Sequence, residues 1–235
     1  SIFLNDERKF CTYIDWLKQH NVDNKLIKDL QYIRTCVPEF LEYVMLYINQ
    51  LKPKIVGCSN NFTQTNASLK LLQMCSEQSY KTIIGGYNCL NYKKAYLSYN
   101  FIDECIEGEC ESSIIDIINN LLCGKKTNDV ALRDKTDILP DYDDYIQQYN
   151  QYYNHKITLF YERSRGCLYA QQNKKCTFCL LDENINKYRY TPTQTFTNNV
   201  NTLYNKYKIK NIFLTDLMLS KKLLTEQWNL DKNIN

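Results

Sequence analysis

Three cysteines in the second half of the chain have a spacing that suits a metal centre. Cys167, Cys176 and Cys179 follow the pattern C-x8-C-x2-C directly after a predicted strand. Two thiolates three residues apart on a loop can bind one metal centre, and a third thiolate upstream adds another ligand. Three protein ligands leave one iron of a [4Fe-4S] cluster open to a substrate. The spacing therefore indicates an iron–sulfur cluster.

Three other interpretations of these thiols stay open. A structural zinc site needs a fourth ligand, for which Cys105, Cys110 and His155 are candidates. Cys176 and Cys179 alone match a C-x-x-C redox pair, although they do not stand at the start of a helix after the first strand. The third interpretation is chance clustering of cysteines, because the chain contains 11 of them. The spacing by itself does not choose among them.

The composition narrows the class of protein. The chain has 235 residues, of which 44% are hydrophobic, with only four Pro and six Gly, so it is globular. The net charge of +3 is too small to make nucleic-acid binding the default. No apolar stretch approaches the roughly 18 residues of a membrane span, and the N-terminal sequence has no signal-peptide pattern. An odd number of cysteines then favours a reducing cytoplasm. From the small charge and the lack of a long apolar stretch, we expect neither a nucleic acid nor a membrane as a partner.

The periodicity of apolar residues predicts helices over residues 10–50, with a separate segment after Pro38. Strands and helices then alternate, which is typical of a parallel sheet covered by helices. The predicted strands lie at 54–59, 81–85, 101–107, 156–164 and 211–216, and the predicted helices between them at 66–78, 112–122 and 194–207.

Small or backbone-exposing residues follow the predicted strands of the first half. Gly57-Cys58-Ser59 ends one strand, Gly85-Gly86 ends the next, and Glu107-Gly108-Glu109 follows the third. The carboxyl ends of parallel strands form the edge at which open α/β sheets bind cofactors. Ordinary tight turns, which use glycine for positive φ angles, are the alternative.

Four short segments stand in a fixed order around the cysteines. Pro-Asp-Tyr-Asp at 140–143 precedes Glu-x-Ser-Arg-Gly-Cys at 162–167, Cys-Thr-Phe-Cys at 176–179, and a Tyr-Arg pair ahead of Thr-Pro within 188–192. This order resembles the opening of a radical S-adenosylmethionine domain, in the cobalamin-dependent group that matures ribosomally made peptides. The chain departs from that group in lacking Trp after the first cysteine and Gly after the last.

The first half is similar to the cobalamin-binding domain that precedes the radical domain in this family. The similarity lies in the runs at 56–69, 83–88 and 101–111. The only histidines are His20 and His155, and the Asp-x-His-x-x-Gly motif is absent, so the resemblance implies cobalt without a histidine below it. It also implies corrin contacts from Ser59, Asn60, Asn61, Phe62, Gln64, Gly85, Gly86, Glu107, Gly108 and Glu109.

For the second half, the resemblance implies that Cys167, Cys176 and Cys179 hold the cluster and that Phe178, Arg189 and Asp216 contact S-adenosylmethionine. Asp216 is equally well explained as a helix N-cap. The implied activity is methylation of an unactivated carbon of a precursor peptide, with flavodoxin or ferredoxin as electron donor. The alternatives are a radical peptide epimerase or rearrangement enzyme and a zinc-stabilised, non-catalytic α/β binding module.

The expected fold class is α/β, with a Rossmann-like cobalamin-binding domain followed by the start of a radical (β/α)6 partial barrel. We expect the first domain at 1–123, a linker at 124–155, and the barrel at 156–235. The first domain lacks a candidate for its own first strand, and the barrel contains two of its roughly six strands. The chain is therefore expected to be a fragment of a longer enzyme.

Overall fold

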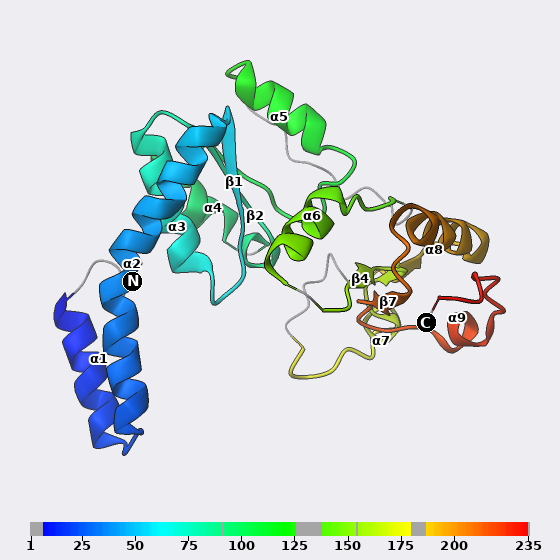
Figure 1. The fold of residues 1–235 in the computed structure, drawn as a ribbon, viewed down its shortest axis with the longest axis horizontal. Helices are drawn as coiled ribbons and strands as arrows, with labels where there is room; N and C mark the ends of the chain where they lie inside the picture. Colours follow the sequence, from blue (N-terminus) through cyan, green and yellow to red (C-terminus); the bar gives the residue numbers. More distant parts are fainter. Residues whose placement is uncertain (1–6, 91, 126–137, 154, 180–186, 235) are drawn as a thin grey trace. The chain divides into compact units, whose positions relative to one another are not determined.

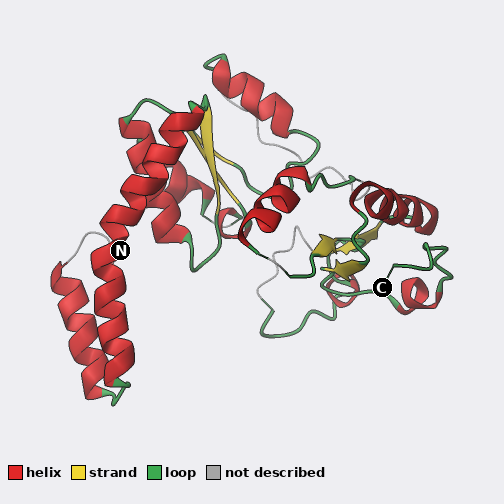
Figure 2. Cartoon of the chain, in the orientation of Figure 1, coloured by secondary structure: helices red, strands yellow, loops and turns green. Residues whose placement is uncertain are grey.

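The computed structural model describes residues 7–90, 92–125, 138–153, 155–179 and 187–234. The chain divides into two compact units, Ser1–Arg133 and Asp134–Asn235. Figure 1 labels the helices and strands, and Figure 2 colours them by type. Each unit combines helices with a small parallel sheet, so the predicted α/β class is confirmed. None of the described helices combines the length and the apolar character needed to cross a membrane.

Two helices open the first unit. The helix α1 (Glu7–Gln19) buries Phe10, Ile14 and Leu17, which recur at helical spacing, against Ile27 of α2 (Asn24–Leu51). Asp23 caps α2, since its carboxylate accepts a hydrogen bond from the Lys25 backbone N–H at 2.9 Å. The two helices lie side by side at the N-terminal half of α2 (Figure 1).

Pro38 lies inside α2, so the prediction of a separate helical segment after this proline was wrong. A proline in a helix removes one backbone hydrogen bond and crowds the preceding turn. Beyond it, Leu41 and Met45 are buried, and Met45 contacts Cys75 of the helix α3 (Thr65–Glu77). This packing holds the helix together past the proline.

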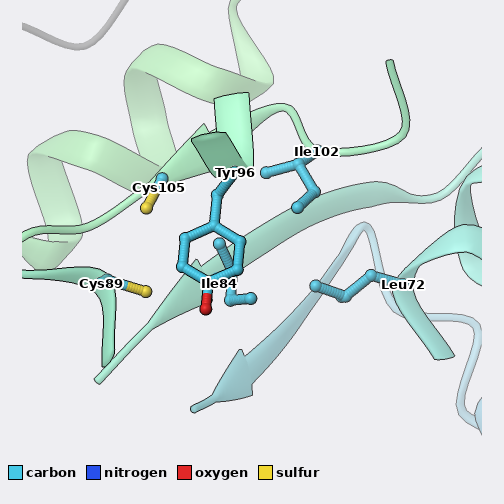
Figure 3. Close-up of a cluster of buried hydrophobic side chains, with 6 residues drawn as sticks. All are labelled: Leu72, Ile84, Cys89, Tyr96, Ile102 and Cys105. Carbon is cyan, nitrogen blue, oxygen red and sulfur yellow. The ribbon is translucent and has the colours of Figure 1, made fainter. Parts of the chain in front are cut away.

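The sheet of the first unit contains three parallel strands in the order β1 (Ile55–Ser59), β2 (Lys81–Gly85) and β3 (Glu104–Cys105). Ile83 and Ile84 are neighbours in β2, so their side chains point to opposite faces of the sheet. Ile84 packs with Leu72 and Tyr96 (Figure 3), whereas Ile83 packs with Ile117. Helices therefore cover both faces. The elements are β1 (Ile55–Ser59), α3 (Thr65–Glu77), β2 (Lys81–Gly85), the short helix η1 (Tyr87–Cys89), α4 (Lys93–Leu97), β3 (Glu104–Cys105) and α5 (Ile114–Leu122).

The second unit contains the strand–helix–strand step that the sequence predicts. The strands β4 (Thr158–Tyr161) and β7 (Asn211–Leu214) pair in parallel, and α8 (Thr193–Tyr207) connects them. The apolar face of α8 packs on Leu159 and Tyr161 of β4. The remaining elements are α6 (Asp143–Tyr152), β5 (Ser164–Arg165), α7 (Leu168–Gln171), β6 (Arg189–Tyr190) and α9 (Lys221–Thr225).

Two features of this unit were not predicted from the sequence. A short antiparallel ladder joins β5 to β6. The helix α6 falls within the range assigned to a linker, and Tyr142 and Ile146 pack against the core of β4 and α8. Residues 126–137 of that range lie outside the described residues.

Candidate functional site

The three cysteines of the C-x8-C-x2-C pattern share one loop after β4 and β5. Cys167 follows Gly166, which has a φ of 91°, and directly precedes α7. A turn joins the other two, because the Cys179 N–H donates to the Cys176 carbonyl at 3.0 Å. All three are free thiols, and Cys176 is exposed. Across the described parts of the chain, no three His, Cys, Asp or Glu side chains gather into a group that could hold a metal ion. The three thiols therefore share a loop without converging.

Asp216 fixes the segment that leads into this loop. Its carboxylate accepts hydrogen bonds from the backbone N–H and the hydroxyl of Ser164, and from the Arg163 N–H at 3.3 Å. The helix that follows, α9, is capped by Ser220, whose hydroxyl accepts from the Leu223 N–H. The N-cap explanation of Asp216 was therefore wrong. Asp216 instead ties the end of β7 to the segment three residues before Cys167.

The other residues implied to contact S-adenosylmethionine are placed differently from one another. Arg189 of β6 pairs with Arg165 of β5. Arg165 lies two residues before Cys167. Phe178 lies in the turn between the last two cysteines and is 85% exposed. The structure thus brings Arg189 and Asp216 to the same segment beside the cysteine loop and leaves the Phe178 ring facing solvent.

Arg163 is a fully buried cation that the sequence analysis missed. Its guanidinium donates to a Glu226 carboxylate oxygen at 2.8 Å, to the Thr193 hydroxyl at 2.9 Å, and to the Leu223 carbonyl at 3.3 Å. The Thr193 hydroxyl, and after it the charge of Arg163, lowers the pKa of Glu226 below its ordinary value. Glu226 is therefore held as a carboxylate, which compensates the buried positive charge.

Two aromatic rings complete the surroundings of Arg163. Its guanidinium carbon lies 4.6 Å from the centre of the Phe196 ring and 4.9 Å from that of Trp228. The residue connects α8 to the end of the chain while its backbone contacts Asp216. An arginine at the end of a strand is usually exposed, so no signal in the sequence marks this one as buried.

At the carboxyl ends of β1 and β2, the chain segments approach closely. The Asn60 N–H donates to the Gly85 carbonyl at 2.7 Å, and the Asn88 N–H donates to the Asn60 carbonyl at 3.2 Å. Gly86 has a φ of 99°, and a Cβ atom there would lie 2.7 Å from both the N and the O of Asn60. The backbone itself therefore requires glycine at position 86. This agrees with the alternative interpretation of the glycine as part of a tight turn.

A buried network of amide and hydroxyl groups lies beside this approach. Asn60 is 1% exposed and donates through its side-chain N–H to the Tyr96 hydroxyl at 2.8 Å. The Asn88 amide donates to the same hydroxyl at 2.9 Å and to the Thr65 hydroxyl at 2.8 Å. Asn60 Oδ1 is buried without a hydrogen-bond partner among the described residues. Of this network, only Asn60 was predicted from the sequence, although Asn88 lies within the run at 83–88.

An aromatic surface flanks the network. Phe62 is 62% exposed, Tyr87 is 36% exposed, and their ring centres lie 6.1 Å apart in a T-shaped contact. Asn61 closes the turn before α3, because its side-chain oxygen accepts from the Thr63 N–H at 3.1 Å. The other residues implied to contact the corrin also follow β1, β2 or β3: Ser59 and Gln64 at or after β1, Gly85 at the end of β2, and Glu107, Gly108 and Glu109 after β3. The structure therefore gathers these residues at the carboxyl ends of the three parallel strands.

Cys105 was one candidate for a fourth zinc ligand. It is fully buried beside Cys89 in the core of the first unit (Figure 3). A hydrogen bond between the two thiols lowers the pKa of Cys89 and raises that of Cys105, and burial raises the latter further. Because zinc binds the thiolate, a buried thiol held in its protonated form is a poor ligand. His155, another candidate, is exposed.

A cavity of about 450 Å³ lies at the amino ends of β4 and β7. This is the opposite end of these strands from the cysteine loop. This cavity was not predicted from the sequence. Its lining contains three cationic side chains and consists of Lys156, Ile157, Lys208, Ile209, Lys210 and Asn211.

Comparisons of the chain with models of protein families, with curated proteins and with solved structures found no significant match. The family resemblance thus depends on the short segments quoted from the sequence. The arrangement of residues around these segments supplies the physical argument for a function.

Proposed function

We propose that this chain carries the cobalamin and iron–sulfur elements of a radical S-adenosylmethionine enzyme that methylates an unactivated carbon of a ribosomally made peptide. The observation that carries the proposal is the loop of Cys167, Cys176 and Cys179. Its three free thiols follow the carboxyl end of a parallel strand, β4, whose partner strand β7 ends two residues before Asp216. Substrates and cofactors bind at this end of the strands in α/β proteins.

The donor set of the loop suits an iron–sulfur cluster, since cysteine thiolates are the usual ligands of such clusters. Binding requires the loop between α7 and Cys176 to bring three sulfur atoms together. The base of the loop is already fixed, because Asp216 holds the backbone of Arg163 and Ser164. When bound, the cluster would supply the electron for reductive cleavage of S-adenosylmethionine. Asp216 and Arg189 would orient that molecule from the segment beside the loop.

The edge of the first sheet suits the cobalamin part of the proposal. Phe62 and Tyr87 offer an exposed aromatic surface to a flat, largely apolar ring system. The buried Oδ1 atom of Asn60 is an acceptor without a partner among the described residues, at the same edge. Gly86 has a different role, because its open side is filled by the Asn60 backbone. When bound, cobalamin would supply the methyl group.

The remaining parts of the proposal come from the resemblance. They are a precursor peptide as substrate, flavodoxin or ferredoxin as electron donor, and a location in the cytoplasm. The Rossmann-like topology of the first unit and the partial barrel of the second belong to the proposal in the same way. The three parallel strands of the first unit and the strand–helix–strand step of the second are compatible with both.

Anaerobic reconstitution with iron and sulfide tests the cluster. We expect about four iron and four sulfide per chain, and loss of most of both in the variant with alanine at positions 167, 176 and 179. The matched control carries alanine in place of Cys11 and Cys123, which are also exposed thiols, and should keep the cluster. Unchanged iron binding in the triple variant would contradict the proposal. Zinc binding without sulfide would favour the non-catalytic zinc module.

The mass of the peptide product separates methylation from the other radical outcome. Each methyl transfer adds one CH₂ to the peptide, whereas epimerisation or rearrangement leaves its mass unchanged. The assay uses the reconstituted protein with S-adenosylmethionine, methylcobalamin and a reductant. An unchanged mass together with formation of 5′-deoxyadenosine would replace the methyltransferase proposal with a radical epimerase or rearrangement enzyme.

A further inference from the structure

The helix α2 carries an apolar stripe that the other described residues leave exposed. Leu26, Ile33, Phe40 and Tyr47 are spaced seven residues apart and therefore lie on one side of the helix. Two further apolar residues lie along the same side. We call the set the α2 seam: Leu26, Ile33, Phe40, Tyr43, Tyr47 and Leu51, which are between 49% and 68% exposed.

A different side of the same helix is already used inside the first unit. Ile27 packs against α1, while Leu41 and Met45 are buried where α2 lies beside α3. Figure 1 shows α1 and α3 beside the two halves of α2. A surface helix of a globular protein normally has one apolar stripe. A second stripe of this length indicates a second partner.

The spacing of the seam predicts that this partner is a helix. Apolar residues repeated every seven positions let two helices interlock along their length. From Leu26 to Leu51 the seam is about 38 Å long, at roughly 1.5 Å per residue. The next longest described helix is α8, with 15 residues, and its apolar face is buried in the core of the second unit. Among the described helices, only another α2 has the length and the free apolar stripe to match it. We infer that a second copy of this chain covers the α2 seam, forming a homodimer through an α2–α2 contact.

The area of the seam agrees with a stable dimer. Six aliphatic and aromatic side chains, each about half to two-thirds exposed, present on the order of 700 Å² per chain. A two-fold contact therefore buries on the order of 1,400 Å² in total, which is within the range of specific protein interfaces. In a two-fold contact the same residues serve both chains, so one seam suffices.

Charge selects the antiparallel alignment. The first half of α2 has Lys25 and Lys28 against Asp29 on its exposed surface, and it is net positive. The second half has Glu39 and Glu42 and no lysine or arginine. Antiparallel helices place the positive half of each beside the negative half of the other, and they also align the helix dipoles favourably.

Substitution in the seam tests the dimer with the whole 235-residue chain. The mass in solution, measured by light scattering after size-exclusion chromatography over a dilution series, should be that of a dimer. Phe40→Glu should weaken the dimer by roughly 100-fold, because it places a carboxylate at the centre of an apolar contact. Ile115→Glu is the matched control, since Ile115 is 66% exposed but lies on α5 and not on α2, and it should keep the dimer. Circular dichroism checks that both variants remain folded.

A charge-swap pair tests the identity of the partner. Phe40→Glu and Phe40→Lys should each be monomeric, and an equimolar mixture should regain the dimer, because the two-fold axis brings residue 40 of one chain near residue 40 of the other. A monomeric wild-type chain would overturn the inference. It would also be overturned by a dimer that survives Phe40→Glu, or by equal weakening in the Ile115→Glu control.

Discussion

The strand ends of the two units prepare their candidate sites in different ways. In the first unit, backbone hydrogen bonds join Asn60 to Gly85 and to Asn88, and the buried Tyr96 hydroxyl connects the two asparagine amides. In the second unit, hydrogen bonds hold the segment before the cysteine loop, where Asp216 binds Ser164. We call this segment the base of the site. The cysteines beyond that base are spread along a loop. A site made of hydrogen-bonding groups can form without its ligand, whereas thiols converge when a metal joins them.

The largest expected effect tests the fixed base in the second unit. Arg163→Met should lower the free energy of unfolding of this unit by about 3–5 kcal/mol, because it leaves Glu226 and the Thr193 hydroxyl without their buried partner. Fluorescence of Trp228, recorded in a Trp16→Phe background during denaturation, measures it. Lys221→Met, an exposed cation in the same unit, should change the value by less than about 0.5 kcal/mol. Equal stability of Arg163→Met and the parent would show that the base is not fixed by this residue.

The next effect tests the close approach in the first unit. Gly86→Ala should cost about 2–4 kcal/mol, since the new Cβ meets the Asn60 backbone and the φ of 99° is unfavourable for alanine. Gly124→Ala is the control, because Gly124 also has a positive φ but open space around it, and should cost about 1 kcal/mol. Amide exchange of β1 and β2 localises the loss. Similar costs at both positions would mean that the approach to Asn60 contributes little.

A smaller effect concerns the buried network. Tyr96→Phe removes the hydroxyl that accepts from both Asn60 and Asn88, and should cost about 1–2 kcal/mol. Tyr92→Phe changes an exposed hydroxyl nearby and should be neutral. Chemical denaturation followed by circular dichroism measures both. If the two variants unfold alike, water satisfies the two asparagine amides, and the hydrogen-bond network at the strand ends of the first unit is not preformed.

The smallest effect is a pH dependence of the stability of the second unit. The pKa of Glu226 is lowered in the folded chain, so the stability that it contributes is present above the ordinary glutamate pKa of about 4.3 and is lost as the pH falls through the lower, folded value. The melting temperature of the second unit should therefore fall more between pH 6 and pH 3 in the parent than in Glu226→Gln. The same pH dependence in both proteins would contradict this assignment.

The periodicity of apolar residues predicted most of the regular elements. The helices predicted at 66–78 and 194–207 end within one residue of α3 and α8, because their apolar residues recur at helical spacing over several turns. The ladder of β5 and β6 escaped prediction, since it contains two residues per strand and is joined across a long stretch of sequence. Pro38 suggested a boundary that packing of Leu41 and Met45 removes.

The sequence by itself determined which residues could carry chemistry, because ligand type and spacing are local properties. It identified the cysteine loop and the strand-end residues from Ser59 to Glu109. Tertiary structure alone decided what these residues contact. It placed Asp216 on the backbone of Ser164, filled the open side of Gly86 with Asn60, and buried Arg163 among aromatic rings. Such contacts join residues far apart in the chain, and their energies depend on distance and burial, which no local pattern of residues contains.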